Sequence, residues 1–171
     1  MAPPTTAYLS IGSNKGDKAA NLHLAIACLD VHPSLQVTAV SRFYKTQPQN
    51  FIDQDWFVNA AVKIQSDTSD PLVLLTILKQ IETQMDKQGK SFRFGPRKID
   101  LDIIYFADMV LKTDALEIPH PRMHERSFVL QPMCDIGPGV IHPVSKMTTR
   151  ELFKQIEKQE NQAVIVLDKE D

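Results

Sequence analysis

The 171-residue sequence predicts an α+β fold, a ferredoxin-like β-α-β-β-α-β sandwich in which both helices cover one face of an antiparallel sheet. Three observations support this class. Four segments have the length and composition of strands. Two segments between them carry apolar residues at helical spacing, each after an aspartate that can cap a helix. The C-terminal third is punctuated by prolines, so we expect it to add short elements to this core.

The first strand and the first helix follow from the residues near the N-terminus. Residues 7–11 are strand-like, and residues 12–17 form a turn that ends at Asp17, which can cap the next helix. Apolar residues then recur at helical spacing up to His32 and Pro33. This spacing predicts a buried helix face formed by Leu22, Ala25, Ile26 and Leu29.

The next two strands and the second helix have comparable signals. Residues 35–44 and 57–64 are predicted strands, and a polar loop containing Pro48 separates them. Asp70 and Pro71 supply an N-cap and a first-turn proline for the second helix. The core face of this helix is expected to hold Leu74, Leu78, Ile81 and Met85.

The remaining elements are the fourth strand and the C-terminal additions. Residues 99–106 are rich in β-branched and aromatic residues, which predicts a strand. Thr148 and Glu151 have the spacing of a capping box for a helix over residues 148–158. Residues 163–167 predict one more short strand.

Size and composition limit the possible function classes. With 43% hydrophobic residues, residues 1–171 are expected to form a single domain with its core at about residues 7–158. The net charge of −2 provides no broad basic field for nucleic-acid binding. No segment reaches membrane-spanning length. Two cysteines without a metal-ligand or redox spacing indicate a reducing cytoplasm, and we expect a monomer.

Two aspartates in the fourth predicted strand form a candidate metal site. Asp100 and Asp102 share one face of the strand, roughly 6 to 7 Å apart. Two like charges beside apolar neighbours repel each other and resist desolvation. A cation resolves this conflict, and carboxylate ligands with room for water and phosphate oxygens suit Mg²⁺. Two metal ions bridged by a carboxylate would form a clamp for displacement at phosphorus.

A simpler interpretation places both aspartates on the solvated face of an edge strand, paired with Arg97 and Lys98. In an alternating strand the same face continues to Ile104 and Phe106. These residues predict that the face is buried further along, which favours the metal site over the solvated face.

A basic segment precedes the aspartates and suggests a polyphosphate ligand. It contains Lys87, Lys90, Arg93, Arg97 and Lys98. Arginine can bind phosphate oxygens through two donors and neutralise charge during transfer. A P-loop is absent, because Gln84 stands where its first glycine should be. Any polyphosphate must therefore be held by scattered basic side chains.

A second basic group begins at His120. His120 and His124 have the spacing of a metal-binding pair on a helix, but Pro121 disturbs the helix start and no third ligand is evident. Phosphate-contacting or solvent-facing roles for His120 and Arg126 are favoured over zinc binding.

The third predicted strand offers a surface for a planar ligand. Phe57 and Asn59 share a strand face, which places an aromatic ring beside an amide that can donate and accept hydrogen bonds. This arrangement suits a planar heterocycle, although phenylalanine in a strand is more often a core residue.

Taken together, these motifs resemble the 6-hydroxymethyl-7,8-dihydropterin pyrophosphokinase family of folate biosynthesis. The family signature Arg-aromatic-Gly-Pro-Arg-x-x-Asp-Leu-Asp is matched from Arg93 to Asp102, with Phe94 at the aromatic position. The likeness extends from Ala7 to about Phe153. Supporting matches are residues 12–14, 43–48 and 59–62, Glu82, Pro119, His120, Arg126 and Phe128.

The resemblance implies transfer of diphosphate from ATP to the pterin hydroxymethyl group, with two Mg²⁺ ions held by Asp100 and Asp102. The triphosphate would be contacted by Lys87, Arg93, Arg97, His120 and Arg126. Of these, Lys87, Arg93 and Arg97 join the two aspartates as expected catalytic residues. The nucleotide-binding site would be lined by Lys79, Glu82, Phe94, Ile103, Leu116 and Glu117. The pterin would lie between Phe57 and Phe128 and be recognised by Asn59 and by Gly12, Thr46, Gln47, Pro48 and Gln49.

Two other functions are compatible with these patterns. One is another Asp-x-Asp metal-dependent transferase, such as a nucleotide-sugar transferase, although the short domain and the Gly-Pro-Arg lead-in argue against it. The other is a ferredoxin-like module that binds a small ligand for regulation. Such a module would not require both aspartates.

Overall fold

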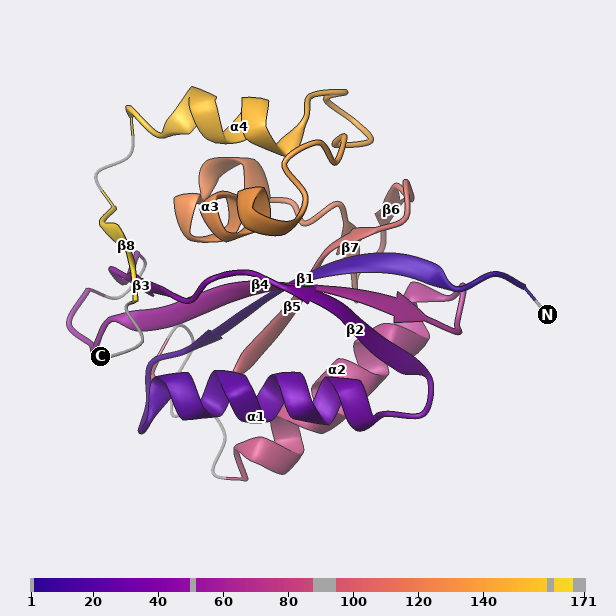
Figure 1. Cartoon of the computed structure of the whole chain (residues 1–171), viewed down its shortest axis with the longest axis horizontal. Coiled ribbons are helices and arrows are strands. Elements are labelled where there is room, and N and C mark those ends of the chain that lie inside the picture. Colours follow the sequence, from indigo (N-terminus) through magenta and orange to yellow (C-terminus); the bar gives the residue numbers. More distant parts are fainter. Residues whose placement is uncertain (1, 50–51, 88–94, 160–161, 168–171) are drawn as a thin grey trace.

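The sheet of this protein separates two layers of helices. Helices α1 (Lys18–Val31) and α2 (Pro71–Met85) cover one face, whereas α3 (Ser127–Ile136) and α4 (Thr149–Ile156) lie on the other (Figure 1). The predicted mixed α/β architecture with an antiparallel sheet is therefore confirmed, and the C-terminal additions supply a second helical layer. The computed structural model describes residues 2–49, 52–87, 95–159 and 162–167.

Among the described residues, six strands form the main sheet. The order is β5-β1-β4-β3-β8, and β2 pairs with β4 on the same side as β3. All of these pairings are antiparallel. The strands are β1 (Thr5–Ser13), β2 (Leu35–Val40), β3 (Tyr44–Thr46), β4 (Phe57–Ser66), β5 (Asp100–Phe106) and β8 (Val164–Val166). A separate short pair consists of β6 (Leu111–Lys112) and β7 (Glu117–Ile118).

The prediction of one continuous strand over residues 35–44 is wrong, because the chain leaves the sheet after Val40. At this point the side chain of Ser41 makes hydrogen bonds to the backbone. Its Oγ accepts a hydrogen bond from the backbone N–H of Ala61 at 2.8 Å and donates to the carbonyl of Arg42 at 2.7 Å. β2 and β3 therefore pair with different parts of β4.

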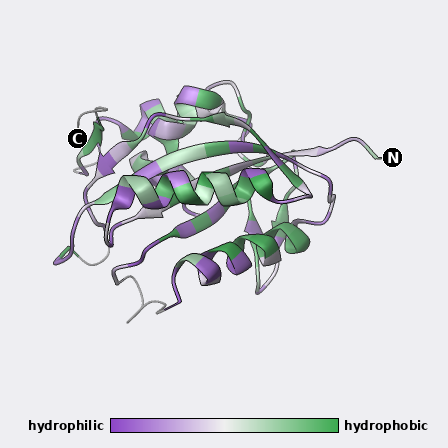
Figure 2. Cartoon of the chain, turned by 60° about the horizontal axis from the view of Figure 1, so that its bottom comes forward, coloured by the Kyte–Doolittle hydropathy of each residue, from purple (hydrophilic) through white to green (hydrophobic). Residues whose placement is uncertain are grey.

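Both predicted caps of the first helical layer are confirmed. The carboxylate of Asp17 accepts from the N–H of Ala20 at 3.1 Å, and that of Asp70 accepts from the N–H of Leu72 at 2.9 Å. Every predicted core residue of these helices is buried except Ile26, which is half-buried. Figure 2 shows that α1 and α2 each carry hydrophobic and hydrophilic residues. Burying one large apolar side chain stabilises a fold by roughly 1.5–3 kcal/mol.

The second helical layer combines one predicted and one unpredicted helix. The capping box of Thr148 and Glu151 is present at α4. Pro132 lies inside α3 and removes a backbone donor there, which explains why this helix was not predicted from the residues alone. A short 3-10 helix, η1 (Met123–Glu125), precedes α3. Among the helices of the described residues, none is both long and apolar enough to cross a membrane.

The two faces of the sheet have separate cores, and a register shift in β5 divides its side chains between them. Leu101 and Ile103 pack in the core under α1 and α2, whereas Ile104 and Tyr105 pack in the core under α3 and α4. The β1 to β5 register shifts at this point. Phe106 therefore belongs to the core under α1 and α2, which we call the first core. The prediction that it shares a face with Asp100, Asp102 and Ile104 is wrong.

Candidate active site

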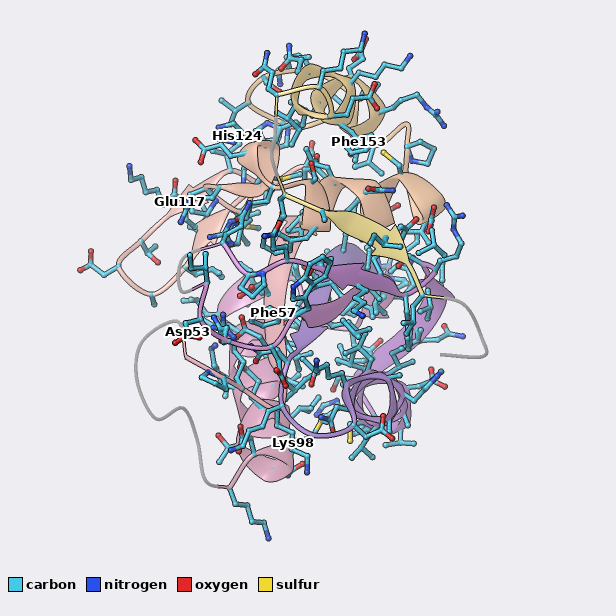
Figure 3. All side chains as sticks on the ribbon, turned by 90° about the vertical axis from the view of Figure 1, so that its left-hand side faces the viewer. Asp53, Phe57, Lys98, Glu117, His124 and Phe153 are labelled. Carbon is cyan, nitrogen blue, oxygen red and sulfur yellow. The ribbon has the colours of Figure 1, made fainter. Side chains whose placement is uncertain are left out.

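A cavity of about 230 Å³ lies where β1, β4 and β5 meet the loop after β3 and the start of α3. It brings together most of the predicted site residues, although they are scattered over more than 110 positions of the sequence. Phe57 lies near the middle of Figure 3, with Glu117 above it and Lys98 below it. The predicted residues that line the cavity are Gly12, Thr46, Gln47, Pro48, Gln49, Phe57, Asn59, Arg97, Asp100, Asp102, His120, Arg126 and Phe128.

The two aspartates lie side by side on β5 and face the cavity. Across the ladder, Ser10 of β1 is opposite Asp102 and Gly12 is opposite Asp100, so small residues leave room beside the carboxylates. Burial and the neighbouring charge of Asp100 raise the pKa of Asp102 to about 7. A cation bound between the two carboxylates would remove this conflict.

The simpler interpretation, in which Asp100 and Asp102 pair with Arg97 and Lys98 on an edge strand, agrees with the structure only in part. β5 is an edge strand, and an Arg97 Nη1 to Asp100 Oδ2 ion pair spans 3.6 Å. Lys98, in contrast, donates its backbone N–H to the carboxylate of Asp86 at 3.1 Å. Because both strand aspartates line the cavity, they are placed to meet a ligand.

Two arginines, Arg97 and Arg126, line the cavity together with the aspartates. The Nε atoms of Arg97 and Arg126 are buried and find no hydrogen-bond partner among the described residues. Each guanidinium lies over an aromatic ring, Arg97 at 5.3 Å from the centre of Phe57 and Arg126 at 5.4 Å from the centre of Phe128. Buried cationic donors without partners fit an anionic ligand such as a polyphosphate.

His120 contributes a neutral imidazole to this group. Burial, followed by the positive charges of Arg126 and Arg122, lowers the pKa of His120 to about 4. Its Nδ1 accepts a hydrogen bond from the backbone N–H of Arg122 at 3.2 Å. The proton of the neutral ring is therefore on Nε2, which makes His120 a hydrogen-bond donor near neutral pH.

Another part of the cavity lining is aromatic and carries an ordered amide. Asn59 is 4% exposed and donates from Nδ2 to the hydroxyl of Thr46. Gly12 pairs with Asn59 across the β1 to β4 ladder, and a Cβ at Gly12 would collide with the Asn59 Oδ1 atom. Phe57 from β4 and Phe128 from α3 complete the apolar lining.

Asn14 holds the loop that carries Arg97. Its Oδ1 accepts from the backbone N–H of Arg97 at 2.9 Å, and its Nδ2 donates to Gln54 Oε1 at 2.7 Å and to the carbonyl of Asp55 at 3.2 Å. The side chain is 2% exposed. One buried amide thus connects three segments around the cavity.

The cavity also contains residues that sequence reasoning missed, namely Ser10, Gln54 and Gln162. Period-two alternation from Gly12 along the first strand could have found Ser10. Nothing in the sequence singled out Gln54 or Gln162, because both reach the cavity only through the tertiary fold.

Several predicted nucleotide residues lie outside this cavity. Lys79 and Glu82 form an ion pair of 2.8 Å on α2. Ile103 is 3% exposed in the first core, Leu116 is half-buried against it, and Glu117 lies in β7. Lys87 is exposed after α2. Arg93 and Phe94, together with Lys90 of the basic segment, fall outside the described residues.

The donor set suits a metal that takes few protein ligands. Within the described part of the chain, no cluster of three or more His, Cys, Asp or Glu side chains could enclose a metal ion. A site built from Asp100 and Asp102 would leave most coordination positions to water and to phosphate oxygens, as Mg²⁺ prefers.

Comparison with known proteins shows the family of this chain. The family model of 7,8-dihydro-6-hydroxymethylpterin-pyrophosphokinase matches residues 8–138, well over half of the chain. The chain belongs to this family. Pyrophosphokinase relatives are also similar over most of its length. One of them, the 2-amino-4-hydroxy-6-hydroxymethyldihydropteridine pyrophosphokinase of Bacillus subtilis, is 38% identical over 155 residues, covering 91% of this chain and 92% of that protein.

Other pyrophosphokinase relatives are parts of longer proteins. The Folic acid synthesis protein FOL1 of Dictyostelium discoideum is 46% identical over 145 residues, which cover 85% of this chain and 22% of FOL1. The chain thus spans about a fifth of FOL1 but nearly all of the Bacillus protein. Family membership and these names support pyrophosphokinase activity in folate biosynthesis, and they do not favour the alternative functions.

The fold agrees with solved members of the pyrophosphokinase group. The crystal structure of Plasmodium falciparum HPPK-DHPS wild type with pteroate has a TM-score of 0.74 to this chain at 17% identity. The match covers 91% of this chain and 44% of that one. At this identity the likeness concerns the fold alone.

Proposed function

We propose that this chain transfers diphosphate from ATP to the hydroxymethyl group of 6-hydroxymethyl-7,8-dihydropterin and releases AMP. One observation carries the proposal. One cavity joins an aromatic lining with an ordered amide to two carboxylates and two arginines, whose Nε atoms have no hydrogen-bond partner among the residues that the structure describes. This arrangement can hold a planar heterocycle with its substituent directed at a metal-bound polyphosphate.

The pterin half of the proposed site is preformed. Phe57 and Phe128 would hold the two faces of the heterocycle, and Asn59 would recognise its polar edge. The Thr46 hydroxyl fixes the Asn59 amide, so this edge is oriented before the substrate binds. Gly12 and residues 47–49 would approach the ring through their backbone.

The phosphate half relies on charge. Asp100 and Asp102 would hold two Mg²⁺ ions, which when bound would neutralise phosphate oxygens and polarise the attacked phosphoryl group. Arg97 and Arg126 would direct their free donors at the same oxygens, and neutral His120 would donate from Nε2. The hydroxymethyl oxygen would bond to the β-phosphorus as the bond to the α,β-bridging oxygen breaks.

The proposal also includes residues beyond the cavity. Lys87 and Arg93 would contact the triphosphate, and the nucleotide would be bound by Lys79, Glu82, Phe94, Ile103, Leu116 and Glu117. Burial lowers the pKa of Lys79, but the hydrogen bond to Glu82 and the charges of Glu82, Asp100 and Asp102 raise it, which supports a role for this part of α2 close to the acidic pair.

Four further properties belong to this proposal. The sheet order β5-β1-β4-β2 supports the ferredoxin-like description of the core. Residues 1–171 would act as a single domain and as a monomer. Two free cysteines, Cys28 and Cys134, are compatible with a cytoplasmic location. The net charge of −2 supports small-molecule substrates without a nucleic-acid partner.

³¹P NMR of the purified protein with Mg²⁺, ATP and 6-hydroxymethyl-7,8-dihydropterin tests this function. We expect AMP and a pterin diphosphate to appear together, and formation of ADP would indicate an ordinary kinase instead. Asp100→Asn and Asp102→Asn should each lower the rate by about 100-fold or more, because each weakens a metal ligand. A near-normal rate in either variant would contradict the metal assignment.

A further inference from the structure

The C-terminal strand β8 extends the sheet next to the cavity. It pairs with β3 so that Val164 is opposite Thr46 and Val166 is opposite Tyr44. Beyond this short ladder, the backbone N–H of Gln47 donates to the carbonyl of Ala163 at 3.0 Å. The segment lies far outside residues 8–138, which match the family model. The family match therefore says nothing about its contribution, which is read from the contacts of this chain.

Gln162 immediately precedes this strand and lines the cavity. Both ends of its side-chain amide are occupied by the loop after β3. Its Nε2 donates to the carbonyl of Gln47, and its Oε1 accepts from Gln49 Nε2 at 3.1 Å. One side chain thus bridges the residues on both sides of Pro48.

The loop at residues 46–49 follows a very short strand. β3 is only three residues long, and Pro48 has no backbone N–H to donate. Thr46, at the start of this loop, carries the hydroxyl that orients the Asn59 amide. Displacement of the loop would therefore disturb both the wall and the amide that faces the ligand.

We propose that Gln162 is a positioning residue for the pterin subsite, and that β8 and Gln162 together hold the loop at residues 46–49 against the heterocycle. The inference rests on the proposed function. It predicts that the C-terminal segment affects recognition of the pterin while leaving the phosphate half of the cavity intact, because Asp100, Asp102 and Arg126 come from other elements.

The test compares full-length Gln162→Ala with wild type and with Gln159→Ala, a matched change at an exposed glutamine shortly after α4. We expect Gln162→Ala to raise the KM for the dihydropterin about tenfold, the effect of roughly one lost net hydrogen bond. The KM for ATP and the thermal midpoint should stay near wild type. Hydrogen exchange should become faster in residues 43–49. Gln162→Glu keeps the acceptor for Gln49 but sets a second acceptor against the carbonyl of Gln47, so it should raise this KM at least as much as Gln162→Ala does.

The possible outcomes distinguish failure of the inference about Gln162 from failure of the proposed function. Active wild-type protein together with an unchanged pterin KM in Gln162→Ala would overturn this inference alone. Equal losses for both substrates with a lower thermal midpoint would also overturn it, because they would indicate general structural damage. If wild type and Gln159→Ala both fail to form AMP and pterin diphosphate, the proposed function itself is wrong.

Discussion

At the residue scale, the candidate site depends on close contacts and buried hydrogen bonds that fix the position of a side-chain amide or of the backbone. Gly12 leaves room for Asn59 Oδ1 because it has no side chain, and Asn14 fixes the backbone of Arg97 through its Oδ1 atom. A buried amide with several partners costs about 1–3 kcal/mol when its hydrogen bonds are broken. These residues therefore shape the cavity without supplying charge.

Gly12→Ala tests this view of the pterin wall. The added methyl group should displace the Asn59 side chain and lower kcat/KM for the dihydropterin by about tenfold or more, because the orienting amide is lost. Steady-state kinetics with each substrate varied in turn measure the effect. Gly139→Ala is the matched control, since a Cβ there has no atom within 4 Å. Wild-type kinetics in Gly12→Ala would show that Asn59 is not held by this contact.

At the element scale, a partly buried network of hydrogen bonds connects α3 to the sheet. Arg42 Nη2 donates to Asp135 Oδ1 at 2.9 Å, and the Tyr44 hydroxyl donates to Asp135 Oδ2 at 2.8 Å. Burial, and next the hydrogen bond to Asp135, raise the pKa of Tyr44 to about 12, so this donor keeps its proton. Because Arg126 and Phe128 belong to the start of the same helix, this attachment also positions part of the cavity.

Asp135→Asn should therefore reduce stability in a pH-dependent way. Burial alone would raise the pKa of Asp135, but the hydrogen bonds from Arg42 and Tyr44 outweigh it and lower the pKa below its ordinary value. The folded state thus binds the proton more weakly than the unfolded state, and the stabilisation is present above about pH 4 and lost as the pH falls further. We expect a difference of about 1 kcal/mol or less at pH 7, since the network is partly solvated.

Urea unfolding of wild type and Asp135→Asn at pH 7 and at pH 3 measures this contribution. The difference in unfolding free energy should shrink at the lower pH. Asp108→Asn, at an exposed aspartate in the turn after β5, provides the control. A difference that is the same at both pH values would mean that the charge of Asp135 does not contribute.

At the scale of the whole molecule, the cavity joins parts of the chain that fold into different layers. Its lining comes from β1, β4, β5, the loop after β3, the segment around His120, the start of α3 and the residue before β8. A ligand that contacts all of them should stabilise the folded state as a unit, because it binds only when these layers are assembled.

Thermal unfolding with Mg²⁺, the non-cleavable analogue α,β-methylene-ATP and the dihydropterin tests this expectation. Ligands at about 100 times their Kd should add about 2.7 kcal/mol, which raises the midpoint by roughly 5–10 °C for a chain of this size. EDTA should remove most of the shift, and Asp102→Asn should reduce it. A shift that persists undiminished in EDTA would exclude a metal role in nucleotide binding.

The sequence by itself determined the local elements and the chemistry of the site. Asp17 and Asp70 cap the helices as predicted, the core faces of α1 and α2 follow their apolar spacing, and Asp100 and Asp102 share one strand face. These features depend on residues close together in the chain, so periodicity and capping chemistry reveal them. The signature at residues 93–102 also indicated the family that the comparisons established.

Only the tertiary structure decided how distant segments meet. Ser41 interrupts the predicted second strand because Ala61 supplies its partner, and the register shift between β1 and β5 moves Phe106 to the other core. Gln162 reaches the cavity because β8 pairs with β3. Such contacts depend on strand order and register between residues far apart in sequence, and local propensity carries no information about either.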